Sequence, residues 1–165
     1  MRLLLCSAVL TLATALSTAK DSWVIREDGT GPAKIGMSIE ELRKVLAPTM
    51  APNPSGYDSC YYVNFKDHPH IAFMILDERL ARIDVDHRGI PDSLGIQVGD
   101  TEASALKAYG SRLKVSPHKY LDDGHYLTAK SADGGYGIRF ETEKGKIIVF
   151  YAGTFEAIQY VEGCL

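Results

Sequence analysis

The chain has 165 residues, of which 18 are Lys or Arg and 21 are Asp or Glu, so its formal net charge is −3. An acidic chain without a run of Lys or Arg repels phosphate backbones, which excludes nucleic acid as an expected partner. The length is enough for one domain, or for two small units that share an interface.

The first segment in chain order has the pattern of a secretory signal peptide. Arg2 is the only charged residue before Lys20, an apolar stretch follows it, and small residues end the segment. This pattern predicts a leader over residues 1–19 that is cleaved near Ala19, and a periplasmic or secreted protein. The apolar stretch is shorter than the roughly 20 residues of a bilayer-spanning helix, so no stable membrane insertion is expected after cleavage.

Two later segments begin in the same way, with an apolar residue, Gly, one further residue and then Ser38 or Thr101. A hydroxyl residue before an apolar-periodic run is a helix N-cap, and Glu41 completes a capping box in the first copy. Pro48 and Gly110 are typical helix ends. The two segments are IGMSIEELRKVLA (35–47) and VGDTEASALKAYG (98–110).

Strand patterns follow each helix in the same order in both halves. The matching pairs are CYYVNF (60–65) with HYLTAK (125–130), IAFMIL (71–76) with YGIRFE (136–141), and DERLARIDV (77–85) with TEKGKIIVF (142–150). Each half is therefore predicted to be a helix followed by an antiparallel meander of three strands, with tight turns before the third. A short strand is expected over 22–27 and a last strand over 154–161.

One helix and three strands cannot cover their own apolar face, whereas two such units side by side can share a core. The predicted fold class is therefore α+β, with two tandem helix-plus-meander repeats over residues 20–92 and 93–165. These repeats are expected to form a continuous sheet with the helices on one face.

Cys60 and Cys164 are the cysteines outside the predicted leader. In an exported protein two cysteines typically form a disulfide, which here would attach the C-terminus to the first half. The alternative is a reactive or metal-binding pair, but neither a CxxC spacing nor an adjacent helix start supports it.

The helix entrances at 35–38 and 98–101, followed by strands and the acidic-Lys-Gly turn at 143–145, resemble the module of the β-lactamase inhibitor protein (BLIP-like) family. They are also similar to the small outer-membrane lipoproteins of the SmpA/OmlA type. Two tandem copies in an exported chain are more similar to the inhibitors, whose modules form a concave sheet that grips an enzyme. The resemblance covers most of residues 34–161. The chain differs from the lipoproteins in lacking a lipidation cysteine at the right place, and from the inhibitors in having one expected disulfide between its halves.

Alternation along the strands predicts which side chains point away from the core. We expect Ile83, Val85, Ile148 and Phe150 to point inward. The opposite face combines aromatic, Met, Arg and apolar residues, which are typical of protein interfaces. The alternative is that the C-terminal strand or the other repeat covers part of this surface. The predicted binding face is Tyr62, Met74, Arg82, Asp84, Tyr126, Arg139, Ile147, Val149 and Tyr151.

The segment 47–59 carries three prolines and is predicted to be a loop. Its apolar residues Met50 and Tyr57 make it a candidate probe of an enzyme cleft, because proline lowers the entropy cost of ordering an inserted loop. A plain connector is the alternative.

No residue is assigned a catalytic role, because no G-x-S-x-G, HExxH or P-loop motif is present. His68 and His70 are interpreted as exposed loop residues, and no metal or cofactor is expected. The sequence therefore favours an exported, non-enzymatic module that binds a protein partner, an envelope enzyme or envelope complex, and inhibits an envelope hydrolase such as a β-lactamase or a lysozyme. An envelope assembly or scaffold protein is the first alternative. A small hydrolase that uses Asp84, Asp86 and His87 is the second.

Overall fold

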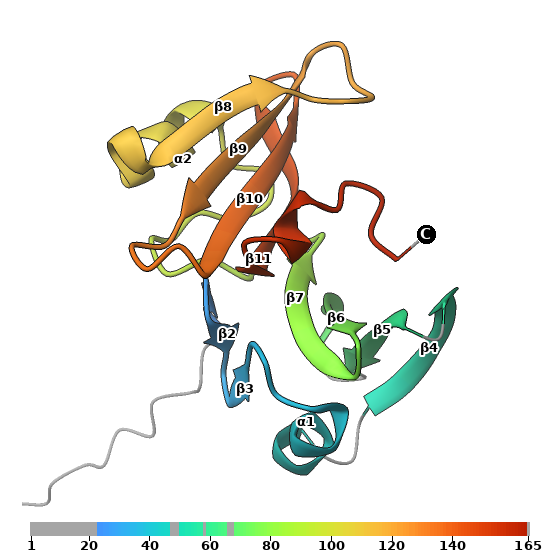
Figure 1. Ribbon diagram of the computed structural model, residues 1–165. Coiled ribbons are helices and arrows are strands. Elements are labelled where there is room, and N and C mark those ends of the chain that lie inside the picture. Colours follow the sequence, from blue (N-terminus) through green and yellow to red (C-terminus); the bar gives the residue numbers. More distant parts are fainter. Residues whose placement is uncertain (1–22, 47–49, 58, 66–67, 165) are drawn as a thin grey trace, which may run out of the picture.

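Eight strands form one antiparallel sheet in the order β4-β5-β6-β7-β11-β10-β9-β8 (Figure 1). The computed structural model describes residues 23–46, 50–57, 59–65 and 68–164, so the predicted leader over residues 1–19 lies outside it. The strands of this sheet are β4 (Met50–Tyr57), β5 (Cys60–Phe65), β6 (His68–Leu76), β7 (Arg79–Val85), β8 (Leu113–Pro117), β9 (Gly124–Lys130), β10 (Tyr136–Glu143) and β11 (Lys146–Thr154).

The remaining elements complete an α+β fold, as predicted. Each helix is followed by four strands rather than the expected three, because β4 and β8 are added at the two edges of the sheet. The two sets of strands meet where β7 pairs with β11. A separate three-stranded sheet precedes the first helix. These elements are β1 (Ile25–Arg26), β2 (Gly29–Thr30), β3 (Ala33–Lys34), α1 (Ile39–Leu46), α2 (Glu102–Tyr109), and the short 3-10 helices η1 (Gly110–Arg112) and η2 (Ala157–Gln159).

Both helices begin directly after the hydroxyl residues expected from the sequence. The Ser38 N–H donates to Glu41 Oε2 at 2.8 Å, and the Glu41 N–H donates to Ser38 Oγ at 3.2 Å. This exchange is the predicted capping box. Thr101 accepts a hydrogen bond of 3.1 Å from the amide of Ser104, the third residue of α2. Gly110 caps the end of α2, also as expected.

The glycine before each helix attaches the chain to a hairpin of the sheet through a backbone hydrogen bond. The Gly36 N–H donates to the carbonyl of Leu80, and the Gly99 N–H donates to the carbonyl of Ile147, both at 2.8 Å. Gly36 and Gly99 have φ values of 92° and 88°, a region that favours residues without a Cβ. The same backbone contact therefore explains why an apolar-Gly-x-Ser/Thr pattern stands before each helix.

Both helices pack on the same face of the large sheet, here called the inner face. Leu42 of α1 and Ala105 of α2 are fully buried in one apolar cluster with the inward residues of the strands. Phe73, Phe140 and Phe150 are the largest fully buried side chains of that cluster. The opposite, outer face is free of helices α1 and α2, so its side chains meet other parts of the chain.

A β-bulge reverses two of the predicted side-chain directions. In the β10–β11 pair Glu141 lies opposite Val149, but Thr142 lies opposite Ile147, so Ile148 is an extra residue. Ile147 is 1% exposed and belongs to the core, whereas Ile148 is 38% exposed. The prediction that Ile147 points outward and Ile148 inward is therefore wrong, because one inserted residue exchanges the two faces.

The segment predicted as a loop over 47–59 is a strand for most of its length. Met50 pairs with Phe65 and Tyr57 pairs with Cys60 along β5. Proline is tolerated here because β4 is an edge strand, whose outward N–H groups need no partner in the sheet. The loop prediction for Met50 and Tyr57 is therefore wrong, and both residues lie at the border of the sheet.

Candidate functional site

The outer face carries all but one of the residues predicted for a binding face. Directly opposite residues of an antiparallel pair share a face. Tyr62 lies opposite Met74, Met74 lies opposite Arg82, and Tyr151 joins the halves by lying opposite Asp84. The predicted residues on this face are Tyr62, Met74, Arg82, Asp84, Tyr126, Arg139, Val149 and Tyr151.

Residues 155–164, here called the C-terminal segment, cover the middle of this face. The predicted strand over 154–161 is not formed, because β11 ends at Thr154 and η2 follows. Ala157 packs instead against Met74 and Ala81. The expected alternative, in which the chain's own C-terminal part covers some of the predicted face, is therefore correct, although that part is not a strand.

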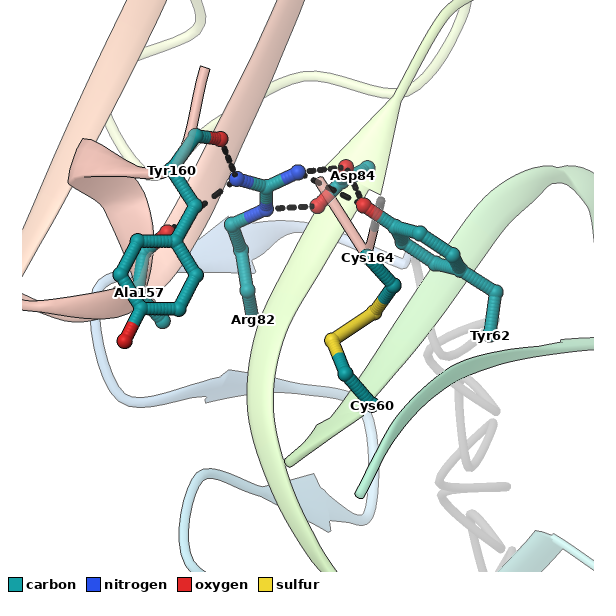
Figure 2. The surroundings of a disulfide bond; sticks show 7 residues. All are labelled: Cys60, Tyr62, Arg82, Asp84, Ala157, Tyr160 and Cys164. Atoms are coloured by element: carbon teal, nitrogen blue, oxygen red, sulfur yellow. Dashed lines mark hydrogen bonds and ion pairs between the residues drawn. A yellow bond between two sulfur atoms is a disulfide. The ribbon is translucent and has the colours of Figure 1, made fainter. Parts of the chain in front are cut away.

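The predicted disulfide between Cys60 and Cys164 is confirmed (Figure 2). It attaches the end of the C-terminal segment to β5, across 104 positions of sequence. Disulfides persist in oxidising compartments, so this bond is compatible with an extracellular or periplasmic location. In the part of the chain that the structure describes, α-helical spans of bilayer length and apolarity do not occur.

Arg82 connects the C-terminal segment to the sheet, as Figure 2 shows. Its Nε and Nη2 donate to the two carboxylate oxygens of Asp84, each at 2.7 Å. Its Nη1 donates to the carbonyl oxygens of Ala157 at 3.1 Å and Tyr160 at 2.6 Å. The hydroxyl of Tyr62 accepts from Nη2 at 2.7 Å. Every nitrogen of the guanidinium is therefore used to hold the structure together.

Asp84 and Arg82 form a buried ion pair, with side chains that are 18% and 4% exposed. Burial raises the pKa of Asp84, and the Arg82 guanidinium opposes that shift. Burial lowers the pKa of Arg82, but the Asp84 carboxylate, with Tyr62 and Tyr151, raises it, so its pKa lies above the ordinary value. Asp84 also accepts a hydrogen bond of 3.2 Å from Tyr62. Its oxygens are therefore occupied by structural contacts.

Of the three residues considered for a hydrolase site, Asp84 and Asp86 line a common pocket and His87 does not. Asp84 and Asp86 line one pocket of about 310 Å³, together with His70. His70 Nδ1 lies 3.2 Å from Asp86 Oδ1, and the His70 ring stacks on His87 with centroids 4.0 Å apart. His68 and His70 stand at the start of β6 rather than in a loop. Within the described residues, groups of three or more His, Cys, Asp or Glu that could hold a metal ion are absent.

A second network fixes the connection between β8 and β9, residues 118–123, here called the Tyr120 loop. Tyr151 donates to Glu141 Oε1 at 2.8 Å, and Glu141 Oε2 lies 3.0 Å from His118 Nε2. The His118 ring stacks on Tyr126 with centroids 4.4 Å apart. The start of the Tyr120 loop is therefore anchored on the outer face. Sequence analysis missed this loop, because its partners lie far away in the chain and no local pattern marks them.

The buried tyrosines predict a loss of stability at alkaline pH. Burial raises the pKa of Tyr151 and of Tyr109, whose hydroxyl donates to Asp92 at 2.5 Å, above the ordinary value of 10.0. The unfolded chain releases these protons near pH 10 while the folded chain keeps them, so their stabilising contribution is complete below that pH and is lost above it. We expect the free energy of unfolding to fall by about 1.4 kcal/mol per pH unit for each tyrosine.

Urea unfolding from about pH 9 to about pH 11 measures this slope. In a Tyr151→Phe variant the slope should be smaller by the contribution of one proton. An unchanged slope in that variant would show that Tyr151 ionises alike in the folded and unfolded chain.

Comparisons with known proteins do not place the chain in a family. The comparison with protein families gave no match, and the comparison with curated proteins gave none. Among solved structures, the chain is similar to a cysteine-rich secretory protein from Staphylococcus aureus subsp. aureus Mu50, with 13% identity and a TM-score of 0.47. The similarity covers 79% of this chain and 48% of that chain, so it spans about half the length of the other protein.

Proposed function

We propose that this protein is an exported, non-enzymatic module that binds a protein partner through its outer face. The partner meets the Tyr120 loop and the C-terminal segment, which lie over the strand residues predicted for the contact. The leader-like segment over residues 1–19 and the disulfide support a periplasmic or secreted location. The oxygens of Asp84 accept hydrogen bonds from Arg82 and Tyr62, which disfavours a role for Asp84 as a catalytic base.

The exposure of Tyr120 on an anchored loop carries this proposal. Tyr120 is 56% exposed, the highest value among the large hydrophobic residues whose exposure the structure describes. Its amide donates to His118 Nδ1 at 3.1 Å, and its hydroxyl donates to Glu162 of the C-terminal segment. Lys119 Nζ lies 3.3 Å from the same carboxylate. An aromatic side chain held in place before binding loses little entropy on association, which is typical of interface hot spots.

The two halves are further proposed to be tandem copies of one BLIP-like unit. Equivalent contacts of Gly36 with Leu80 and of Gly99 with Ile147 support this proposal. The mirrored strand order about β7 and β11 supports it as well. With the resemblance of the helix entrances to the inhibitor family, these observations favour an envelope hydrolase, such as a β-lactamase or a lysozyme, as the partner.

The test is inhibition of purified β-lactamases and lysozymes by the wild-type protein and by a Tyr120→Ala variant. We expect the wild type to inhibit one of these enzymes, and Tyr120→Ala to weaken binding by about 2 kcal/mol, or about thirtyfold, with an unchanged melting temperature. The matched control is Leu94→Ala, which truncates a residue that is 47% exposed in the segment between β7 and α2. It should bind like the wild type.

Equal losses of binding in the Tyr120→Ala and Leu94→Ala variants would show that the Tyr120 loop is not part of the contact. If no hydrolase is bound or inhibited, the inhibitor function is wrong. Stable association of the mature protein with an outer-membrane complex would then favour the envelope assembly or scaffold role.

A further inference from the structure

A pocket of about 410 Å³ on the outer face of the second half gathers four positive side chains and no carboxylate. They are Arg112, Lys114, Lys130 and Arg139. The chain as a whole is acidic, so this local excess of positive charge does not follow from composition. It is independent of the Tyr120 contact proposed above.

Arg139 is the central observation, because it is a buried charge without a counter-ion. Its residue is 8% exposed, yet it forms no ion pair with any described residue. Its Nε donates to Thr128 Oγ1 at 2.9 Å and its Nη2 donates to Gln159 Oε1, both neutral acceptors. The guanidinium also lies over the Tyr126 ring, 5.1 Å from its centroid. Burying a charge without neutralising it is costly, so the pocket is arranged to receive an anion.

Arg82 is a second buried arginine on the outer face, but it has a counter-ion. Arg82 is buried on the same face to a similar extent, with 3% of the residue exposed, and Asp84 neutralises it through two hydrogen bonds of 2.7 Å. Arg139 has no such partner in the described chain, although β10 places it in the same sheet and facing the same way. Arg82 therefore forms a structural ion pair, whereas the charge of Arg139 is available to a ligand.

Two lysines of the pocket are also not neutralised. Lys114 Nζ donates to the carbonyl of Ser111 at 3.2 Å, and Lys130 Nζ lies over the Phe155 ring, 4.3 Å from its centroid. Only Arg112 is paired with an acid, Glu27, which does not line the pocket. Three positive charges therefore converge on the space without a compensating carboxylate.

We propose that this pocket binds a phosphate or sulfate monoester. Arginine and lysine with hydroxyl donors are the groups that recognise these tetrahedral anions, and Ser116 and Thr128 supply the hydroxyls. The volume is in the range of small-molecule sites and exceeds what a bare anion fills, so the organic part of the ester lies along the Phe155 side. A monoester dianion matches the converging charge better than a single carboxylate.

Isothermal titration of the purified protein with glucose 6-phosphate, glucose 6-sulfate, inorganic phosphate and glucose tests the proposal. We expect saturable binding of at least one ester, weaker binding of inorganic phosphate, none of glucose, and affinity that falls with added salt. The two ester arms distinguish phosphate from sulfate as the preferred group. No saturable binding of either ester, or equal binding of glucose, overturns the proposal.

Two variants locate the site. Lys114→Gln with Lys130→Gln should weaken ester binding at least about tenfold. The control Lys44→Gln with Lys107→Gln removes the same charge from exposed positions on α1 and α2 and should leave it unchanged. Arg139→Met should abolish binding without lowering the melting temperature of the ligand-free protein, because it removes an unneutralised buried charge. Equal weakening in the two lysine pairs would show an effect of overall charge only, and retained binding in Arg139→Met would contradict a site at this residue.

Discussion

Replacing Asp84 with Asn is expected to lower the free energy of unfolding by about 3 kcal/mol, because the buried Arg82 guanidinium then loses its counter-ion. The Arg82 side chain is 4% exposed and its Nε and Nη2 both donate to Asp84 at 2.7 Å. Asparagine keeps the shape but supplies no negative charge. Equilibrium unfolding in urea measures the loss. The melting temperature should fall with it.

Asp86→Asn is the matched control. Asp86 directly follows β7 and lines the same pocket as Asp84, but its side chain is 70% exposed. Its loss should change the free energy of unfolding by less than about 0.5 kcal/mol. The hydrolase alternative instead predicts that both variants abolish some turnover and leave stability nearly unchanged. A stable Asp84→Asn protein would therefore contradict the structural role assigned here and reopen a catalytic one.

A double replacement, Arg82→Met with Asp84→Leu, separates the loss of a counter-ion from the loss of shape. Buried ion pairs are often replaceable by apolar residues of similar size at little cost. The double variant should therefore be more stable than Asp84→Asn alone, although it gives up the hydrogen bonds to Ala157 and Tyr160. If it is less stable, those two hydrogen bonds contribute more than the ion pair costs.

Local signals in the sequence were sufficient for the helices. Ser38, Glu41 and Thr101 make hydrogen bonds within three residues of their own position, so the pattern contains all of the partners. Alternation likewise placed Tyr62 and Arg139 on the correct face, because side-chain direction in a strand has a period of two. The pairing of Cys60 with Cys164 followed from there being no other cysteine outside the predicted leader.

The errors arose where distant contacts decide the conformation. Ile147 was misplaced by a bulge that depends on how β11 pairs with β10, and nothing in its neighbouring residues marks it. Pro-rich β4 is a strand only because it lies at the edge of the sheet. The segment after Thr154 has a strand-like composition, yet Arg82, which is distant in the sequence, donates hydrogen bonds to its carbonyl groups at Ala157 and Tyr160. The position of the Tyr120 loop and the lack of an ion pair at Arg139 also depend on residues that are distant in the sequence. Neither could be predicted from local patterns.

Replacing Cys60 and Cys164 with Ser is expected to lower the free energy of unfolding by about 4 to 5 kcal/mol. This is the largest change in stability expected for any substitution considered. The bond joins residues 104 positions apart, and cross-linking a loop of that size removes a large amount of conformational entropy from the unfolded chain. Urea unfolding of the variant measures the loss. Wild-type protein under reducing conditions should reproduce it, which controls for the serine side chains themselves.

The same variant tests whether the disulfide or Arg82 holds the C-terminal segment on the outer face. Arg82 binds the carbonyls of Ala157 and Tyr160, upstream of Cys164, so these contacts should survive when the bond is lost. Hydrogen exchange should then show protection at Gln159 and Tyr160, whose amides donate to Glu156 and Ala157, and a loss at Gly163. Loss of protection throughout residues 157–163 would mean that the disulfide alone holds the segment. In that case reduction would expose Met74, against which Ala157 packs, and the surface offered to a partner would depend on the redox state of its surroundings.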